Sequence, residues 1–276
     1  MLAFLGEYMR NLGISHVRAI VIIGVLGEAG ISAPAVRACL DRMAASELVR
    51  RERVGREIEV HLTERARRVL DEGSRRVHER NPFVPRGDGW TLVSFSLSED
   101  QRAVRHRLRA ALGWEGFAPL RDGLWVAPGE VELSSVLQSL PPDLPSAAII
   151  AFRAQELPEF PIADALGNVW NLDDIRAEHE LFLATWGEAG SWDGITNPLA
   201  AHVALVADWL ALLRADPRLP GSVLGAGWPA GESLHAFHAR GAEMGDAAAE
   251  FRLLTQQSVA QRTRQPGARK GAAPAA

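Results

Sequence analysis

Arginines gather in two short segments near the N-terminus of this 276-residue chain, and their spacing suits contacts with a polyanion. Arg37 and Arg42 lie in the first segment, which has the pattern of a short helix. The second segment carries Arg50, Arg51, Arg53 and Arg56. Guanidinium groups donate paired hydrogen bonds to phosphates and to guanine edges. The sequence therefore predicts a surface for double-stranded DNA, built from a helix and a neighbouring basic segment.

The first basic segment has the start signal and the periodicity of a helix. Ser32 is a good N-cap, because its hydroxyl can accept a hydrogen bond from an amide of the first turn. Pro34 falls in that turn, where its missing N–H costs nothing. The apolar face is predicted to carry Val36, Leu40 and Met43. On the opposite face, the small side chain of Ala35 beside Arg37 would let the helix approach DNA closely.

The second basic segment reads as a hairpin. An extended run begins at Leu48, Gly55 sits where a turn is needed, and the returning strand alternates Ile58, Val60 and Leu62. A helix predicted over residues 16–28, capped by Ser15 and closed by Gly30, precedes the basic helix. Helix, turn, helix and basic ribbon in this order predict a winged helix-turn-helix. The alternative is an amphipathic helix and an ordinary hairpin with a solvated arginine face.

Charge is distributed unevenly along the chain. The formal net charge is −4, but residues 1–86 hold 15 Arg and 11 Asp or Glu, a net of +4. Residues 262–276 hold three Arg and one Lys without an acid, also +4, which leaves −12 for residues 87–261. A basic end on an acidic body is typical of a protein that presents one end to nucleic acid.

The rest of the chain predicts two further domains after a charged helix over residues 63–79, so the fold class is α+β and multidomain. Residues 87–160 show strand, helix, two strands, helix and strand over 90–95, 99–112, 117–126, 131–140 and 147–153, the β-α-β-β-α-β order of a ferredoxin-like fold. Residues 161–257 predict a helical domain with helices over 174–186, 197–215 and 231–257. The tail, residues 258–276, is expected to be disordered.

Composition indicates the cellular compartment in which the protein is expected to act. We find no apolar run of the roughly 18 residues that a membrane span needs, and no signal-peptide pattern. The single cysteine, Cys39, excludes an internal disulfide and a cysteine-based zinc site. These features predict a cytoplasmic protein without a membrane partner. The DNA-binding domain is expected to span residues 1–86.

Five patterns in the same order resemble the PaaX family, repressors of phenylacetic-acid catabolism, over nearly the whole chain up to about residue 250. They are 35–38 with 42–43, 90–95 with Arg105 and 109–112, 116–117 with 123–126, 170–172 with Phe182, and 216–220 with 228–229 and Gly231. No single pattern is specific, but their order is.

The resemblance implies a winged-helix N-terminal domain, a central domain similar in fold to Cas2 nucleases and a helical C-terminal domain. It also implies a homodimer on a palindromic operator, released by an aryl-CoA thioester. Three positions depart from the family pattern: His179 stands where a tyrosine is common, Leu210 where an arginine is frequent, and Gly225 where a proline is frequent. These departures lie in the expected effector half, so the identity of the ligand carries over less well than the fold.

The resemblance also raises the question of catalysis. A Cas2-like nuclease needs an aspartate at the end of the first strand, but here the carboxylates come later, at Glu99 and Asp100. His235 and His238 are spaced for one helix face, yet no third metal ligand is evident nearby. We therefore expect no enzyme, no metal and no cofactor. A metal-dependent nuclease, or a winged helix that binds protein rather than DNA, are the alternatives.

A CoA thioester needs cations for its phosphates and an apolar slot for its acyl group. Cations crowd the predicted helix over 99–112, at Arg105, Arg107 and Arg109. The predicted slot and its neighbourhood comprise Trp125, Trp170, His179 and Trp209. The alternative is that the tryptophans belong to the core and the arginines to a solvated surface.

Overall fold

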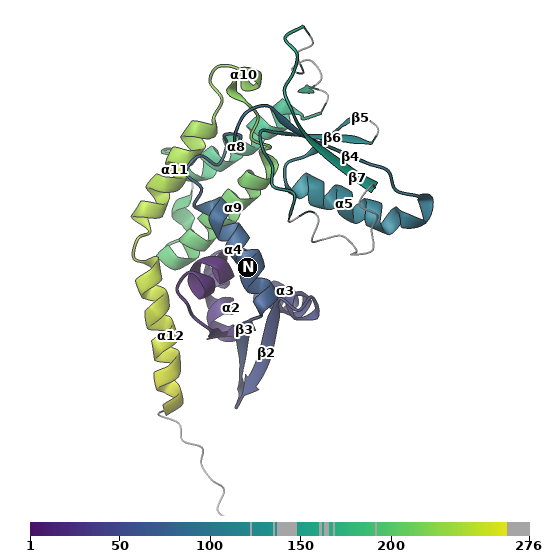
Figure 1. Ribbon diagram of the computed structural model, residues 1–276. Helices are drawn as coiled ribbons and strands as arrows, with labels where there is room; N and C mark the ends of the chain where they lie inside the picture. Colours follow the sequence, from purple (N-terminus) through teal and green to yellow (C-terminus); the bar gives the residue numbers. More distant parts are fainter. Residues whose placement is uncertain are drawn as a thin grey trace, which may run out of the picture. The chain divides into compact units, whose positions relative to one another are not determined.

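The computed structural model describes residues 1–121, 123–134, 136, 148–159, 162, 166–167, 169–190 and 192–263. The chain divides into two compact units (Figure 1). Unit 1 comprises residues 1–75, 192–207 and 239–276, and unit 2 comprises residues 76–191 and 208–238.

Unit 1 combines a small sheet with short helices. Its N-terminal elements are α1 (Leu2–Phe4), the π-helix η1 (Leu5–Arg10), β1 (His16–Arg18), α2 (Ala19–Glu28), α3 (Ala33–Ala45), β2 (Val49–Val54), β3 (Glu57–Leu62) and most of α4 (Glu64–Val77). The strands form an antiparallel sheet in the order β1-β3-β2. The predicted hairpin is confirmed, and Gly55 makes its turn with a φ of +66°.

The expected helix over residues 16–28 is wrong in its first three residues. These form β1, which pairs with β3 so that Val17 faces Val60. The β-branched side chain of Val17 suits a strand, and pairing satisfies backbone groups of β3 on the side away from β2. The helix α2 begins only at Ala19, and Ile20 is exposed rather than part of the core.

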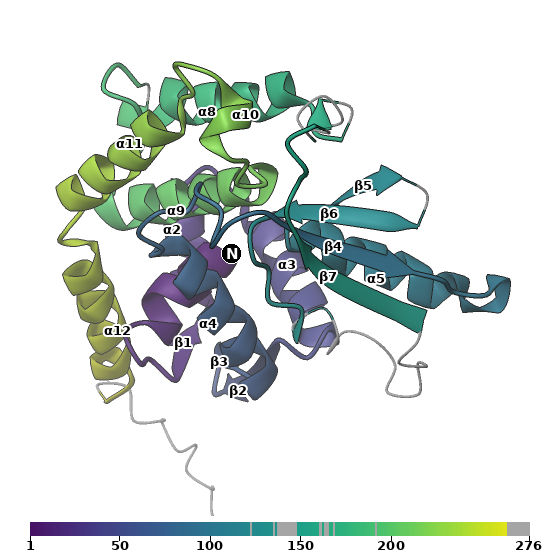
Figure 2. The same cartoon turned by 45° about the horizontal axis from the view of Figure 1, so that its top comes forward.

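Unit 1 is completed by segments from the end of the chain. Phe251 of α12 (Ala247–Thr263) is fully buried and packs edge-on against Phe4, with ring centroids 5.4 Å apart. The Tyr8 hydroxyl forms a 2.6 Å hydrogen bond with Nδ1 of His202 in α9 (Pro198–Ala215). Within unit 1, α12 also contacts β1 (Figure 2). The core of the N-terminal segment therefore depends on residues that lie far away in the sequence.

The helix expected over 231–257 is wrong, because two helices occupy this region. α11 (Ala230–Glu243) ends before a turn over residues 244–246, and α12 starts at Ala247. Gly245 in the turn lowers helix propensity. α12 continues to Thr263, six residues into the tail that was expected to be disordered, so that expectation is wrong for residues 258–263. The remainder of the tail, 264–276, lies outside the described residues.

Unit 2 contains the second sheet, in the antiparallel order β5-β6-β4-β7. Its strands are β4 (Trp90–Phe95), β5 (Ala118–Arg121), β6 (Leu124–Pro128) and β7 (Ile149–Ala154), with η2 (Glu99–Gln101) and α5 (Arg102–Trp114) between β4 and β5. This order and pairing fit the predicted ferredoxin-like arrangement. The predicted helix over 131–140 is wrong for residues 131–133, which are not helical, while residues 135 and 137–140 lie outside the described residues.

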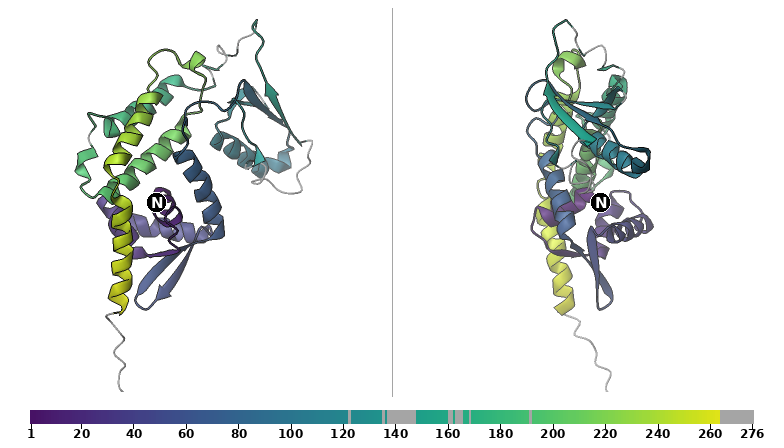
Figure 3. Two further views of the ribbon diagram at one scale, coloured as in Figure 1. Left: turned by 60° about the vertical axis from the view of Figure 1, so that its left-hand side comes forward. Right: turned by 45° about the vertical axis from the view of Figure 1, so that its right-hand side comes forward.

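Each face of this sheet has its own core. On one face, Val93 and Ala127 pack with Leu108 and Leu112 of α5. On the other face, Trp90 and Val126 pack with Leu166 and Leu219 and with the partly buried Trp170. The two β6 neighbours Val126 and Ala127 point to opposite faces, as the pleat requires. Figure 3 shows α5 lying along the sheet.

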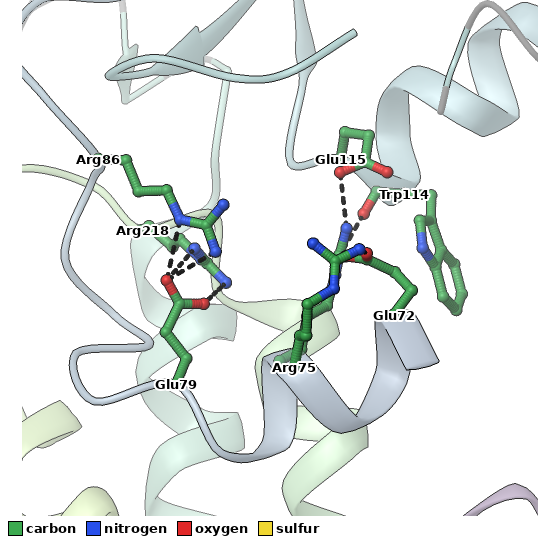
Figure 4. A network of polar contacts seen from close by, with 8 residues as sticks. Glu72, Arg75, Glu79, Arg86, Trp114, Glu115 and Arg218 are labelled. Atoms are coloured by element: carbon green, nitrogen blue, oxygen red, sulfur yellow. Dashed lines mark hydrogen bonds and ion pairs between the residues drawn. The ribbon is translucent and has the colours of Figure 1, made fainter. Parts of the chain in front are cut away.

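Helices form the rest of unit 2: α8 (Leu172–Trp186), the later part of α9, α10 (Gly221–Leu224) and most of α11. A short 3-10 helix, η4 (Trp192–Gly194), belongs to unit 1. The segment between α4 and β4 is fastened by Glu79, which accepts from Arg218 at 2.8 Å and pairs with Arg86 at 2.9 Å (Figure 4). Its Phe83 is buried against Trp209.

The expectation that no apolar run reaches membrane-spanning length needs correction. By length and composition α9 is apolar enough to cross a membrane, although half of it is buried inside the protein. Its central residues Leu205, Val206 and Trp209 are core residues with at most 1% exposure. His202, Asp208 and Arg214 interrupt this helix, so its sequence is not a continuous apolar run.

Candidate nucleic-acid interface

The helix α3 has the cap and the faces that its sequence predicts. The Ser32 hydroxyl accepts a hydrogen bond from the Ala35 amide at 3.4 Å, and Pro34 lies in the first turn. The buried face consists of Val36, Leu40 and Met43. Gly30, with a φ of +83°, ends the preceding helix and allows the short turn between them. One face of α3 is therefore packed against the core, and the opposite face is exposed to solvent.

The open side of α3 presents Ala35, Arg37 and Arg42, all of which are exposed. Among the described residues, neither arginine has a carboxylate partner. The nearby Asp41 is engaged by Arg51 of β2. Arg37 and Arg42 therefore keep their full charge for an external partner.

The hairpin of β2 and β3 divides its arginines into two groups. Arg50 pairs with Glu52 at 2.9 Å, and Arg51 pairs with Asp41. Within the described part of the chain, Arg53 bonds the carbonyl of Gly55 at 3.3 Å and no carboxylate, and Arg56 lies in the turn; both are exposed. Among the described residues, the arginines near the turn of the hairpin thus have no carboxylate partner, whereas Arg50 and Arg51, further from the turn, are each paired with a carboxylate. Figure 1 shows β2 and β3 as a two-stranded projection of unit 1.

One face of this sheet holds a polar cluster that the sequence did not indicate. Strand register places His16 opposite His61 and Arg18 opposite Glu59. The two imidazoles stack with centroids 5.3 Å apart, and His61 Nε2 lies 3.7 Å from Glu59. Glu59 is only 5% exposed. The cluster depends on β1, where the sequence pattern predicts a helix instead of a strand.

The arginines expected to bind an effector are displayed along α5. Arg107 and Arg109 are exposed, whereas Arg105 donates to the carbonyl of Leu97 at 2.7 Å and pairs with Glu99 at 3.7 Å. Arg105 therefore also has a structural role, because it ties the helix to the end of β4.

The aromatic residues expected to form the effector slot lie in separate places. Trp125 joins the α5 side of the sheet beside Phe95, and Trp170 joins the core of the opposite face. Trp209 is fully buried, stacks on Phe237 at 4.3 Å and donates from its indole N–H to the carbonyl of Val77 at 3.3 Å. Unit 2 does not gather these tryptophans around one slot.

His179 is fully buried at the centre of a polar network. Its Nε2–H donates to the carboxylate of Asp216 at 2.9 Å, and its Nδ1 lies 2.9 Å from the hydroxyl of Ser233. Asp216 also accepts from the amide of Arg218 at 2.6 Å. These contacts join α8, the 216–220 segment and α11. Because His179 and Ser233 are both 0% exposed, this Asp–His–Ser arrangement is closed to solvent.

Metal binding finds no support in the described part of the chain. No group of three or more His, Cys, Asp or Glu side chains there could hold an ion. His235 and His238 are exposed on α11. Glu99 and Asp100 form a 3-10 turn that is closed by a capping box of Ser98 and Gln101.

Comparison with known families matches two consecutive parts of the chain. Residues 85–158 match the PaaX protein central Cas2-like domain, and residues 170–253 match the PaaX-like protein C-terminal domain. Together these matches cover more than half of the 276 residues. The chain belongs to the PaaX family. Its sheet β5-β6-β4-β7 is thus the Cas2-like part of a PaaX protein, and the family supports a role in transcription regulation.

A solved structure resembles this PaaX protein in fold. It is the uncharacterized protein Rv0674 from Mycobacterium tuberculosis, which is 22% identical, with a TM-score of 0.50 over 84% of this chain and 89% of that one. At this identity the likeness concerns the fold alone. The comparison with curated proteins finds no match.

Proposed function

We propose that this PaaX protein is a DNA-binding transcriptional repressor whose N-terminal elements act as a winged helix. In this proposal α3 enters the major groove and the β2–β3 hairpin is the wing that contacts phosphates. The observation that carries it is a set of exposed arginines on these two neighbouring elements that have no carboxylate partner among the described residues: Arg37, Arg42, Arg53 and Arg56.

The proposed oligomeric state, operator and effector are inferred from the resemblance to the PaaX family. The regulator would act as a homodimer on a palindromic operator of an aromatic-acid catabolic operon, such as one for phenylacetate. An aryl-CoA thioester would release it from DNA by favouring a state in which the two recognition helices no longer match the half-site spacing.

The test is a gel-shift titration with the promoter upstream of the protein's own gene, using wild type and an Arg37→Ala, Arg42→Ala double variant. We expect the double variant to bind at least tenfold more weakly and to lose discrimination against base changes, because each good base contact is worth about 1–3 kcal/mol. Arg102→Ala, which removes an exposed arginine of α5 in unit 2, is the matched control and should bind like wild type. Equal binding by the double variant would rule out α3 as the recognition helix.

Addition of phenylacetyl-CoA to the wild-type complex tests the release. Dissociation of the complex by the thioester, but not by free phenylacetate, would support an aryl-CoA effector. Binding that persists at saturating thioester would limit the proposal to DNA recognition.

A further inference from the structure

Trp114 stands out among the aromatic residues of unit 2 because its side chain is 48% exposed at the C-terminal end of α5. Two guanidiniums lie near the indole: that of Arg214 is 4.5 Å from the ring centroid and that of Arg76 is 6.0 Å away. An exposed indole beside arginines offers a flat π surface together with donors for an anion.

The two arginines differ in how much charge they can offer. Arg76 donates to the carboxylate of Glu115 at 2.6 Å, so these opposite charges largely cancel (Figure 4 shows Glu115 beside Trp114). Arg214 is exposed and, among the described residues, has no carboxylate partner. Arg214 is therefore the guanidinium near Trp114 that is not paired with a described carboxylate.

A second cation lies on the same face of α5. Arg107 precedes Trp114 by seven residues, nearly two helical turns, and so lies about 10 Å away along the helix axis. Ala110 lies between them on this face, and both it and Arg107 are exposed. The small alanine places no long side chain of α5 between the arginine and the tryptophan. Like Arg214, Arg107 has no carboxylate partner in the described part of the chain.

We propose that Trp114, Arg214 and Arg107 form a binding site for an adenine nucleotide, with the base stacked on the exposed part of the indole and the phosphates held by the guanidiniums. Stacking on an aromatic face and bonding to arginine are the two interactions through which proteins commonly hold bases and phosphates. The site provides both, and the ribose that joins base to phosphates lets one ligand reach both.

Two kinds of ligand carry an adenine base joined to phosphates: a free nucleotide, or a CoA thioester through its nucleotide half. In the second case the inference rests on the proposed function, because the site would then hold the nucleotide end of the effector. Trp209, which is predicted from the sequence to line an effector slot, is buried in the core of unit 2 and therefore offers no exposed ring for stacking.

Isothermal titration calorimetry on the full chain tests the site, with adenosine 3′,5′-bisphosphate, coenzyme A and adenosine as probes. We expect the bisphosphate to bind and adenosine to bind much more weakly. Trp114→Ala should weaken the bisphosphate at least about fivefold, the lower end of what one stacked base contributes, and Trp114→Phe should restore part of that loss. Arg214→Gln should weaken the bisphosphate while leaving the weak adenosine binding unchanged.

Arg102→Ala, on another face of the same helix, is the control and should bind the bisphosphate like wild type. Tighter binding of coenzyme A than of the bisphosphate would identify the CoA source, and equal or weaker binding would identify a free nucleotide. The proposal is overturned if wild type binds no nucleotide at millimolar concentration, if Trp114→Ala binds equally well, or if an oligonucleotide displaces the bisphosphate as the preferred ligand. Gel shifts on the same variants measure DNA binding independently, so failure of the nucleotide site can be distinguished from failure of DNA recognition.

Discussion

At the scale of single residues, hydrogen bonds of buried polar side chains determine which distant segments pack against each other. Tyr8 is 2% exposed and is hydrogen-bonded to His202, while His179 is 0% exposed and is hydrogen-bonded to Asp216 and Ser233. A buried polar group without a partner is costly, so each network specifies which segments must meet. Tyr8 fixes the N-terminal helix against α9, and His179 fixes α8 against α11.

The first prediction concerns Tyr8, the only tyrosine of the chain. Burial, together with the nearby carboxylates Glu7 and Glu250, raises the pKa of Tyr8 well above its ordinary value. Above about pH 10 the unfolded chain therefore releases the phenolic proton while the folded chain keeps it, and stability falls as pH rises. Urea midpoints between pH 8 and 11 should decline less steeply in Tyr8→Phe than in wild type.

The absorbance of the phenolate provides an independent control, because it reports Tyr8 alone. Ionisation of native protein near pH 10, without unfolding, would contradict the buried position of Tyr8.

The second prediction concerns the network around His179. Asp216→Ala leaves the buried imidazole N–H without an acceptor and should lower the free energy of unfolding by about 2 kcal/mol. Chemical denaturation followed by tryptophan fluorescence measures the change. Asp88→Ala removes an exposed aspartate and should shift the midpoint little. Equal effects of the two variants would mean that the network adds no stability.

At the scale of elements, local sequence signals decide most boundaries, and distant segments decide the rest. Ser32 and Gly30 set the ends of neighbouring helices through interactions within a few residues. Residues 16–18 form a strand because β3 pairs with them, and α12 is ordered where Phe251 meets Phe4 and Tyr8. The N-terminal elements of unit 1 therefore gain stability from the end of the chain.

The third prediction follows from this packing of α12. Phe251→Ala should lower the free energy of unfolding by about 3–5 kcal/mol, because it removes a fully buried ring from the core of unit 1. Leu253→Ala, two residues further on and 56% exposed, is the matched control and should change it by less than about 0.5 kcal/mol. Thermal melts of both variants decide the question, and a similar shift for both would contradict the role of α12.

At the scale of the whole molecule, the uneven charge distribution predicts how binding depends on salt. Residues 87–261 carry −12, so attraction to DNA must come from the basic segments. If Arg53 and Arg56 each neutralise one phosphate, removing both should reduce the slope of log K against log salt by about 1.8. Affinities of the double alanine variant and wild type for the same duplex, across a salt series, measure this fourth prediction. An unchanged slope would place the hairpin away from the phosphates.

The sequence by itself determined the features that depend on near neighbours. Helical periodicity identified the buried face of α3, the turn residue Gly55 identified the hairpin, and alternating strands identified the sheet that includes Trp90. The exposed arginines of α3 and the hairpin tip were predictable for the same reason, because an amphipathic pattern leaves its charged side open to solvent. The family resemblance, confirmed by two domain matches, likewise depends on short patterns of neighbouring residues, such as 90–95 and 216–220.

Only the tertiary structure decided which residues meet across long separations. Trp209 and His179 carry no local signal that they are sealed in a core, and Trp114 carries none that Arg214 lies over its ring. The pairing of β1 with β3 and the docking of Phe251 likewise join segments that are remote in the chain. Burial and pairing across such distances depend on how all elements pack together, whereas sequence periodicity reports only which side of a single element is apolar.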